Sequence, residues 1–120
     1  MKVMITSLGE SLESPIDPRF GRARYFIIYN TSSNKWTIQK NNQIHVSAKT
    51  AEMEACKIAV DCNVSVIATG HCRLNSLRSL AENKVAVFFN SLGSVKDKIQ
   101  YFLKTIKNVK REWYLENYSN

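Results

Sequence analysis

The sequence predicts a single α/β domain in which helices flank a mixed five-stranded sheet. The expected elements follow the order β-β-β-α-β-α-β-α, and helices alternate with strands in the second half of the chain. That alternation is typical of parallel strands joined by right-handed crossovers. The 120 residues, of which 44% are hydrophobic, suffice for one domain around one core.

Three strands are expected in the first half of the chain. Residues 2–7 predict the first strand, and a long irregular loop at 8–23 separates it from the second strand at 24–30. A turn cluster at 31–34 then leads into residues 35–40, whose alternation of polar and apolar residues predicts a half-exposed strand. The second and third strands are therefore expected to pair as a hairpin.

A helix is expected after the polar connection at residues 41–47. Apolar residues recur at three- and four-residue steps from Ala51 to Cys62, which indicates one buried face. Ser47 or Thr50 could cap the start of this helix.

Two strands and two helices complete the domain. Residues 64–69 are rich in β-branched residues, and a helix is expected to follow from Leu74 to Ala81. Residues 85–89 are almost wholly apolar, which predicts a strand buried on both faces. From Ser94 onward, apolar residues at helical spacing predict a third helix.

The most informative segment is the loop at residues 14–26. Pro15 and Pro18 fix backbone angles and remove hydrogen-bond donors, so they hold the loop out of regular structure. Gly21 can adopt backbone angles that other residues resist. The loop also concentrates positive charge in Arg19, Arg22 and Arg24. A rigid cationic loop that leads into a buried strand is typical of a binding site for an anion.

Residues 18–26, Pro-Arg-Phe-Gly-Arg-Ala-Arg-Tyr-Phe, resemble the P-x-F-G-R-A-x-Y-F signature of the dinitrogenase iron–molybdenum cofactor biosynthesis family. Members of that family are small accessory and carrier proteins of nitrogenase cofactor assembly. The resemblance extends over residues 1–107 and implies a ribonuclease-H-like fold for them. Residues 108–120 would then form a basic and aromatic tail beyond the family domain.

The resemblance implies a binding protein rather than an enzyme. Its expected ligand is an anionic iron–molybdenum or iron–sulfur cluster, with a nitrogenase-assembly protein as partner and nitrogen fixation as the setting. The alternative is a stand-alone family member of unassigned role that binds another anionic ligand or nucleic acid. Dedicated carriers tend to have a histidine immediately before the Phe-Gly pair, where this chain has Arg19. Arginine cannot coordinate iron, although it can bind an anion by charge and hydrogen bonds.

Three loops are expected to converge at the carboxyl ends of the parallel strands, where ligands of open α/β sheets bind. They follow the first, fourth and fifth strands, at residues 8–22, 70–73 and 90–94. The last two loops lead into helix N-termini, which offer free N–H groups and the positive end of a dipole. We therefore expect a concave, cationic pocket rich in N–H groups. Its candidate cofactor-binding residues are Arg19, Phe20, Gly21, Arg22, Gly70, His71, Cys72 and Arg73.

His71 and Cys72 are the candidate metal ligands, since imidazole and thiolate suit iron and other borderline or soft metals. The helix N-terminus and the adjacent Arg73 are expected to lower the pKa of Cys72 and favour its thiolate. Two neighbouring residues are fewer than a stable protein-only site needs, and His45 is a third candidate. The polar connection around His45 is more typical of a solvent-facing residue.

The formal charge of +7 and the pI near 9.5 favour anionic partners. An anionic metal cluster, a small anionic ligand and nucleic acid all fit this charge. Nucleic acid is the least favoured, because few aromatic residues are interleaved with the basic ones.

The sequence carries no signature of an enzyme. It has no phosphate-binding P-loop, no glycine-rich dinucleotide turn and no nucleophile elbow. The first strand and residues 64–70 contain no acidic residue, which argues against the two-metal site of ribonuclease-H-type nucleases.

The chain is expected to be cytoplasmic and to have no membrane partner. It has no apolar run long enough to cross a bilayer, and residues 1–6 do not resemble a signal peptide. Its cysteines, Cys56, Cys62 and Cys72, are expected to be free thiols. The aromatic residues at 113–118 predict either a last helical turn or a docking segment for a partner or second subunit, so a homodimer is left open.

Overall fold

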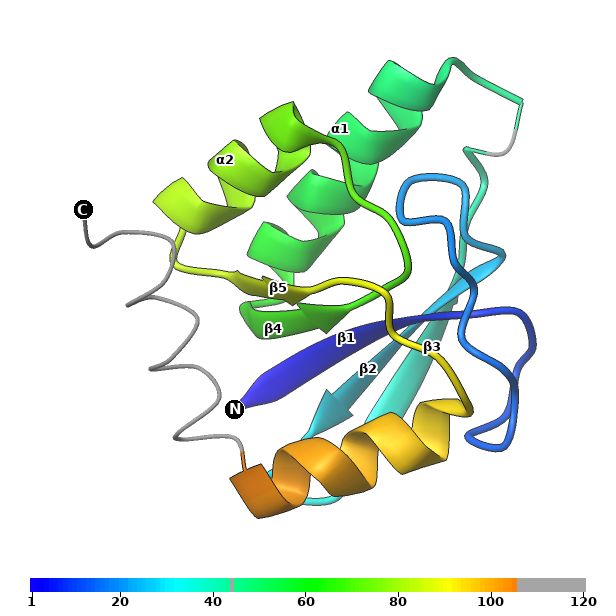
Figure 1. Cartoon of the computed structure of the whole chain (residues 1–120), viewed down its shortest axis with the longest axis vertical. Helices are drawn as coiled ribbons and strands as arrows, with labels where there is room; N and C mark the ends of the chain where they lie inside the picture. Colours follow the sequence, from blue (N-terminus) through cyan, green and yellow to red (C-terminus); the bar gives the residue numbers. More distant parts are fainter. Residues whose placement is uncertain (44, 106–120) are drawn as a thin grey trace.

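A mixed five-stranded sheet lies between helices on its two faces (Figure 1). The computed structural model describes residues 1–43 and 45–105. Its elements are β1 (Lys2–Ser7), β2 (Tyr25–Asn30), β3 (Trp36–Lys40), α1 (Ala48–Asp61), β4 (Val64–Ala68), α2 (Leu74–Glu82), β5 (Ala86–Phe88) and a third helix, described over residues 95–105. The predicted fold class and element order are confirmed.

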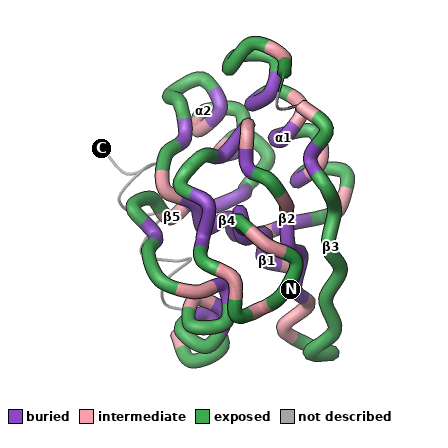
Figure 2. Tube along the Cα trace, turned by 90° about the vertical axis from the view of Figure 1, so that its right-hand side faces the viewer, coloured by how far each residue is buried: buried purple, intermediate pink, exposed green. Residues whose placement is uncertain are grey.

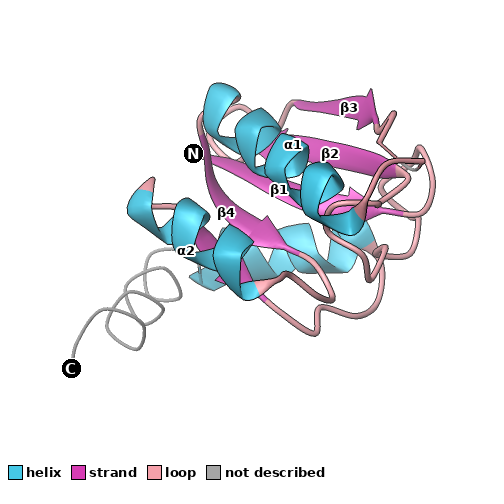
Figure 3. Ribbon diagram, turned by 90° about the horizontal axis from the view of Figure 1, so that it is seen from above, coloured by secondary structure: helices cyan, strands magenta, loops and turns pink. Residues whose placement is uncertain are grey.

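The strands lie in the order β3-β2-β1-β4-β5. β1 pairs antiparallel with β2, and β2 pairs antiparallel with β3 in the predicted hairpin. β1 and β4 are parallel, as are β4 and β5. Figure 3 shows β3 as the outermost strand on one side. This topology brings the carboxyl ends of β1, β4 and β5 to the same end of the sheet.

The core is divided between the two faces of the sheet. Because successive strand residues point to opposite faces, Met4 lies in the cluster under α1 and α2, whereas Val3 and Ile5 lie in the cluster under the third helix. Ala86 and Val87 of β5 are buried in different clusters in the same way. The prediction that this strand is buried on both faces is therefore confirmed.

Serine caps begin two of the helices. Ser47 precedes α1, and its hydroxyl accepts a bond from the Thr50 backbone N–H at 3.1 Å, which agrees with the first of the two predicted caps. The Ser94 hydroxyl accepts a bond from the Asp97 N–H at 3.1 Å at the start of the third helix. Both bonds satisfy amides that the first turn of a helix leaves without partners.

The prediction of a half-exposed third strand is wrong, because all five residues of β3 are exposed. Edge position alone does not explain this exposure, because β5 is also an edge strand and its Ala86 and Val87 are buried. No residue of β3 belongs to either core cluster of the described residues, so the sequence alternation has no buried face to form. Within residues 1–43 and 45–105, no helix combines the length and the apolar character required to span a membrane.

Candidate functional site

Three loops meet at the carboxyl ends of β1, β4 and β5, as predicted. Backbone hydrogen bonds join the loop after β1 to both of the others. The Ile16 N–H donates to the Gly93 carbonyl at 2.9 Å, and the His71 N–H donates to the Pro18 carbonyl at 2.8 Å. The loop after β1 is thus fixed against both neighbours by main-chain contacts.

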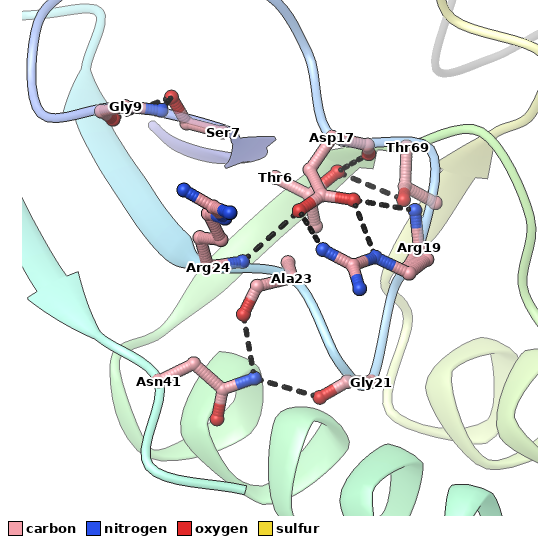
Figure 4. Close-up of polar contacts among 10 residues, drawn as sticks. All are labelled: Thr6, Ser7, Gly9, Asp17, Arg19, Gly21, Ala23, Arg24, Asn41 and Thr69. Atoms are coloured by element: carbon pink, nitrogen blue, oxygen red, sulfur yellow. Dashed lines mark hydrogen bonds and ion pairs between the residues drawn. The ribbon is translucent and has the colours of Figure 1, made fainter. Parts of the chain in front are cut away.

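The buried carboxylate of Asp17 organises the loop after β1 (Figure 4). Its Oδ1 accepts bonds from the backbone N–H and the Nε of Arg19, at 3.0 and 3.1 Å. Its Oδ2 accepts bonds from Nη2 of Arg19 and from the backbone N–H of Arg24, both at 3.0 Å. One side chain therefore fixes the segment between these arginines at both ends.

Thr6 holds the backbone of Asp17, and Thr69 in turn bonds to Thr6. The Thr6 hydroxyl donates to the Asp17 carbonyl at 2.7 Å, and the Asp17 N–H donates to the Thr6 carbonyl at 2.8 Å. Because the one hydroxyl hydrogen of Thr6 is used there, the Thr69 hydroxyl donates to the Thr6 oxygen, at 2.9 Å. Asp17 is thereby attached to the ends of both β1 and β4.

Asn41 closes the other side of the loop. Its buried Nδ2 donates to the carbonyls of Gly21 and Ala23, at 2.7 and 2.8 Å (Figure 4). This amide supplies the two donors that the turn between these residues requires.

Gly21 and Gly70 allow the chain to pack backbone against backbone. A Cβ at Gly21 would lie 2.6 Å from Cγ and 2.7 Å from the backbone N of Glu52 on α1. A Cβ at Gly70 would lie 2.6 Å from both the Cα and the carbonyl oxygen of Pro18. The two glycines therefore bring the loop close to α1 and to the end of β4.

A cavity of about 240 Å³ lies between this loop, α1 and the loop after β4. The residues that line it are Pro18, Arg19, Phe20, Gly21, Arg22, Ala48, Glu52 and His71. Five of the eight predicted cofactor-binding residues are therefore brought together here. The other three lie elsewhere: Gly70 packs on Pro18, Cys72 is buried in the core, and Arg73 lines a neighbouring cavity of about 260 Å³ between α1 and α2.

The three arginines of the loop do not converge on the cavity. The guanidinium of Arg19 is bound to Asp17, whose hydrogen bond and charge raise the pKa of Arg19. Nη2 of Arg22 donates to the Val46 carbonyl at 2.6 Å, but its buried Nε has no hydrogen-bond partner in the described part of the chain. Arg24 is exposed, does not line the cavity, and points away from Arg19 in Figure 4. The guanidinium of Arg22 therefore keeps a hydrogen-bond donor, Nε, that no described residue uses.

The expectation of an N–H-rich pocket is wrong at the start of the third helix, and one of the donors ahead of α2 is also occupied. The N–H groups of Val95 and Lys96, which begin the third helix, donate to carbonyls of the loop after β1 at 2.9 and 2.7 Å. Ahead of α2, the Arg73 N–H donates to Oε1 of Glu52 at 2.9 Å. Oxygen atoms of the protein itself therefore occupy donors that were expected to receive an anion.

The prediction that the pKa of Cys72 is lowered is also wrong. Burial of the thiol, together with the nearby charge of Glu52, raises the pKa of Cys72 to about 12. The side chain is therefore a thiol at neutral pH, which is a poor metal ligand. Ligation by Cys72 stays a prediction, and it would require the thiol to lose its proton first. Cys56, Cys62 and Cys72 are all free, as expected.

Within the described residues, no group of three or more His, Cys, Asp or Glu side chains is placed to hold a metal ion. His71 is exposed and lines the cavity, whereas His45 is exposed in the connection before α1 and does not line it. Metal ligation by either histidine stays a prediction.

The sequence analysis did not single out Asp17, Asn41 or Glu52 as parts of the site. Asp17 carries a local signal, since an Asp between two prolines and two residues before an arginine is a frequent turn former. Asn41 and Glu52 carry no local sequence signal, because each forms its hydrogen bonds with residues about 20 positions away.

The profile of the family described as dinitrogenase iron-molybdenum cofactor matches residues 1–105. The chain belongs to this family. The resemblance inferred from residues 18–26 is thereby confirmed. The predicted tail, residues 108–120, lies outside the residues that the structure describes.

Two solved structures share the fold of this chain. The apo form of the orange protein from Desulfovibrio gigas is 23% identical with a TM-score of 0.80, and the match covers 86% of this chain and 87% of that chain. A Thermotoga protein described as a candidate NifB protein is 28% identical with a TM-score of 0.71, again over 86% of this chain and 87% of that chain. No curated protein matches the chain significantly.

Proposed function

We propose that this protein is a small carrier, without catalytic activity of its own, that binds an anionic iron–molybdenum or iron–sulfur cluster in the cavity beside Arg22. Family membership supports the class of ligand. The observation that carries the proposal is Arg22, which lines the cavity and whose buried Nε has no hydrogen-bond partner among the described residues. A buried donor without an acceptor is costly, and a modest turn of the Arg22 side chain toward the cavity would let an anionic ligand supply one.

Each part of the cavity wall has a role in this proposal. Arg22 provides charge and the free N–H, and the exposed His71 provides an imidazole nitrogen for the cluster. Phe20 and Pro18 supply apolar surface that shields the ligand from water. Arg19 shapes the wall but has its charge matched by Asp17.

The carboxylate of Glu52 also lines the cavity and offsets part of the positive charge. Binding is therefore expected to be moderate, which suits a carrier that has to release its ligand. The cluster is cargo: the protein holds it, limits its contact with water and passes it to a nitrogenase-assembly protein, and no bond within the cluster is made or broken.

The test is anaerobic incubation of the full chain with isolated iron–molybdenum cofactor or with a synthetic iron–sulfur cluster, followed by gel filtration and metal analysis. We expect a coloured complex of fixed stoichiometry. Arg22→Gln should weaken binding about tenfold, the loss expected for one charge-assisted hydrogen bond. The matched control is Arg24→Gln, which removes the same charge from the same loop outside the cavity and should leave the affinity within about twofold.

Two outcomes would overturn the proposal. One is wild-type protein that elutes without metal after incubation with either cluster. The other is an equal loss of affinity in the two variants, because that would indicate attraction to the overall positive charge rather than a site at Arg22.

A further inference from the structure

Among residues 1–43 and 45–105, no strand covers the outer edge of β3 at any point along its length. β3 is the terminal strand of the sheet, and no other strand of the described part of the chain pairs with its outer side. Figure 2 shows this strand exposed at the margin of the molecule. Exposed edges of this kind template the addition of another strand unless they are blocked. β3 contains no proline, and a lysine occurs only at its last position.

The hydrogen bonds between β2 and β3 reveal which groups face outward. The Asn30 N–H donates to the Lys35 carbonyl at 2.8 Å, and the Asn41 N–H donates to the Arg24 carbonyl at 3.1 Å. Hydrogen-bonded and non-hydrogen-bonded pairs alternate in an antiparallel ladder. The odd-numbered residues from 35 to 41 therefore bond to β2.

It follows that the backbone N–H and C=O groups of Trp36, Ile38 and Lys40 point away from β2, toward the open edge. The side chains of the same three residues lie on one face of the sheet, because they are two positions apart. Trp36 and Ile38 are each 38% exposed there.

We propose that this edge pairs antiparallel with β3 of a second copy of the chain, about a twofold axis at Ile38. This is the register that matches all five residues of one strand with all five of the other. Ile38 lies opposite Ile38 of the second copy, and its N–H and C=O form two bonds with the same groups there. Trp36 lies opposite Lys40 of the second copy, and Lys40 opposite Trp36, with bonds in both pairs.

The side chains favour a second copy in this register over an unrelated strand. Each lysine at position 40 faces an indole, which attracts a cation, and not another lysine. The two isoleucines pack against each other at the axis, and on the opposite face Thr37 meets Gln39 of the second copy. The strand is thus complementary to itself, as a twofold interface requires.

A five-residue strand pair is smaller than the interface of a stable dimer, so the association is expected to be weak and to appear toward about 1 mM protein. Each copy carries a formal charge of +7, so long-range repulsion opposes it. Screening by about 0.5 M salt should therefore strengthen the dimer rather than weaken it.

Amide hydrogen exchange of the full chain tests the register directly. The amides of Trp36, Ile38 and Lys40 should become protected as the protein concentration rises from about 10 µM to about 1 mM. Those of Thr37 and Gln39 serve as an internal control, because β2 protects them at every concentration. The proposal would be contradicted if the three outward amides exchange rapidly at every concentration. It would also be contradicted if their protection is the same at about 10 µM and at about 1 mM protein.

A charge swap supplies an independent test by sedimentation equilibrium. Trp36→Lys places two like charges opposite each other in each pair and should weaken the dimer at least about tenfold. Adding Lys40→Glu to that variant converts both clashes into ion pairs, and the affinity should return to within about threefold of the wild type. Both positions are exposed, and circular dichroism checks that the variants are folded. A double variant that remains as weak as Trp36→Lys rules out this register.

Discussion

Arg19 and Arg22 belong to the same loop and line the same cavity, yet their environments differ. The guanidinium of Arg19 is held by the buried carboxylate of Asp17 through two hydrogen bonds, although 54% of the Arg19 side chain is exposed. Arg22 is more enclosed, makes one bond to a backbone carbonyl and keeps a buried Nε without a partner in the described residues. The exposed arginine is thus structural, and the enclosed one is available to a ligand.

The largest expected effect comes from removing the group that distinguishes the two arginines. Asp17→Ala leaves the partly buried backbone N–H groups of Arg19 and Arg24 without the acceptor they have now and breaks the ion pair, so we expect the free energy of unfolding to fall by roughly 3 kcal/mol. Chemical denaturation measures this loss.

Arg19→Gln is the matched comparison, since it breaks the ion pair but keeps both backbone bonds to Asp17. It should cost roughly 1 kcal/mol. Equal losses in the two variants would show that the ion pair, and not the fixing of the backbone, is what Asp17 contributes.

Gly21 lies between the two arginines and sets the distance of Arg22 from α1. Gly21→Ala should cost roughly 2 kcal/mol, because the added methyl group meets the backbone of α1 at 2.7 Å. Gly9→Ala is the control, since its methyl group would meet the hydroxyl of Ser14, the end of a side chain that can rotate. A thermal-unfolding pair in which Gly9→Ala is the more damaging variant would contradict this reading of the loop.

The buried thiol of Cys72 makes the stability of the fold sensitive to alkaline pH. The thiol deprotonates at a pH of about 8.5 in the unfolded chain but at about 12 in the folded one, so the unfolded state loses its proton first. Stability is full below pH 8.5 and should then fall by up to about 1.4 kcal/mol per pH unit as the pH rises. Cys72→Ala should show a shallower decline in denaturation experiments from pH 8 to 10. Identical slopes would mean that the thiol titrates alike in both states.

Glu52→Gln should increase the difference between Arg19 and Arg22 in their availability to a ligand. Its expected effect is the smallest of those predicted. It removes the negative charge beside Arg22, while the amide oxygen can still accept the bond from the Arg73 N–H. We expect cluster affinity to rise about threefold, as one weakened charge interaction near a surface predicts. Anaerobic titration measures it, and a lower affinity would mean that the carboxylate itself holds the ligand.

The fold could be predicted from the sequence because its signals are local and periodic. β1 was expected at residues 2–7 and lies at Lys2–Ser7, since an apolar run next to an irregular loop has few other solutions. The exposure of β3 could not be predicted in this way. It depends on which strands the two core clusters reach, and alternation within one strand does not encode that.

The site could be predicted only in outline. The loop signature located Phe20 and Gly21 at the cavity, but no local pattern reveals that Asp17 takes up the charge of Arg19. The error for Cys72 has a similar origin. Its expected activation rested on the adjacent helix terminus, whereas burial of the thiol is the main cause of its raised pKa. The charge of Glu52, which bonds to that terminus from a different helix, adds to the rise.

The most direct measurement is the amide NMR spectrum of the full chain before and after anaerobic addition of isolated iron–molybdenum cofactor. The account predicts that paramagnetic broadening and shifts centre on residues 18–22 and His71, where Arg22 offers its free donor. Changes centred instead on the cavity between α1 and α2, around Arg73 and Ser79, or spread evenly over the basic surface, would contradict it.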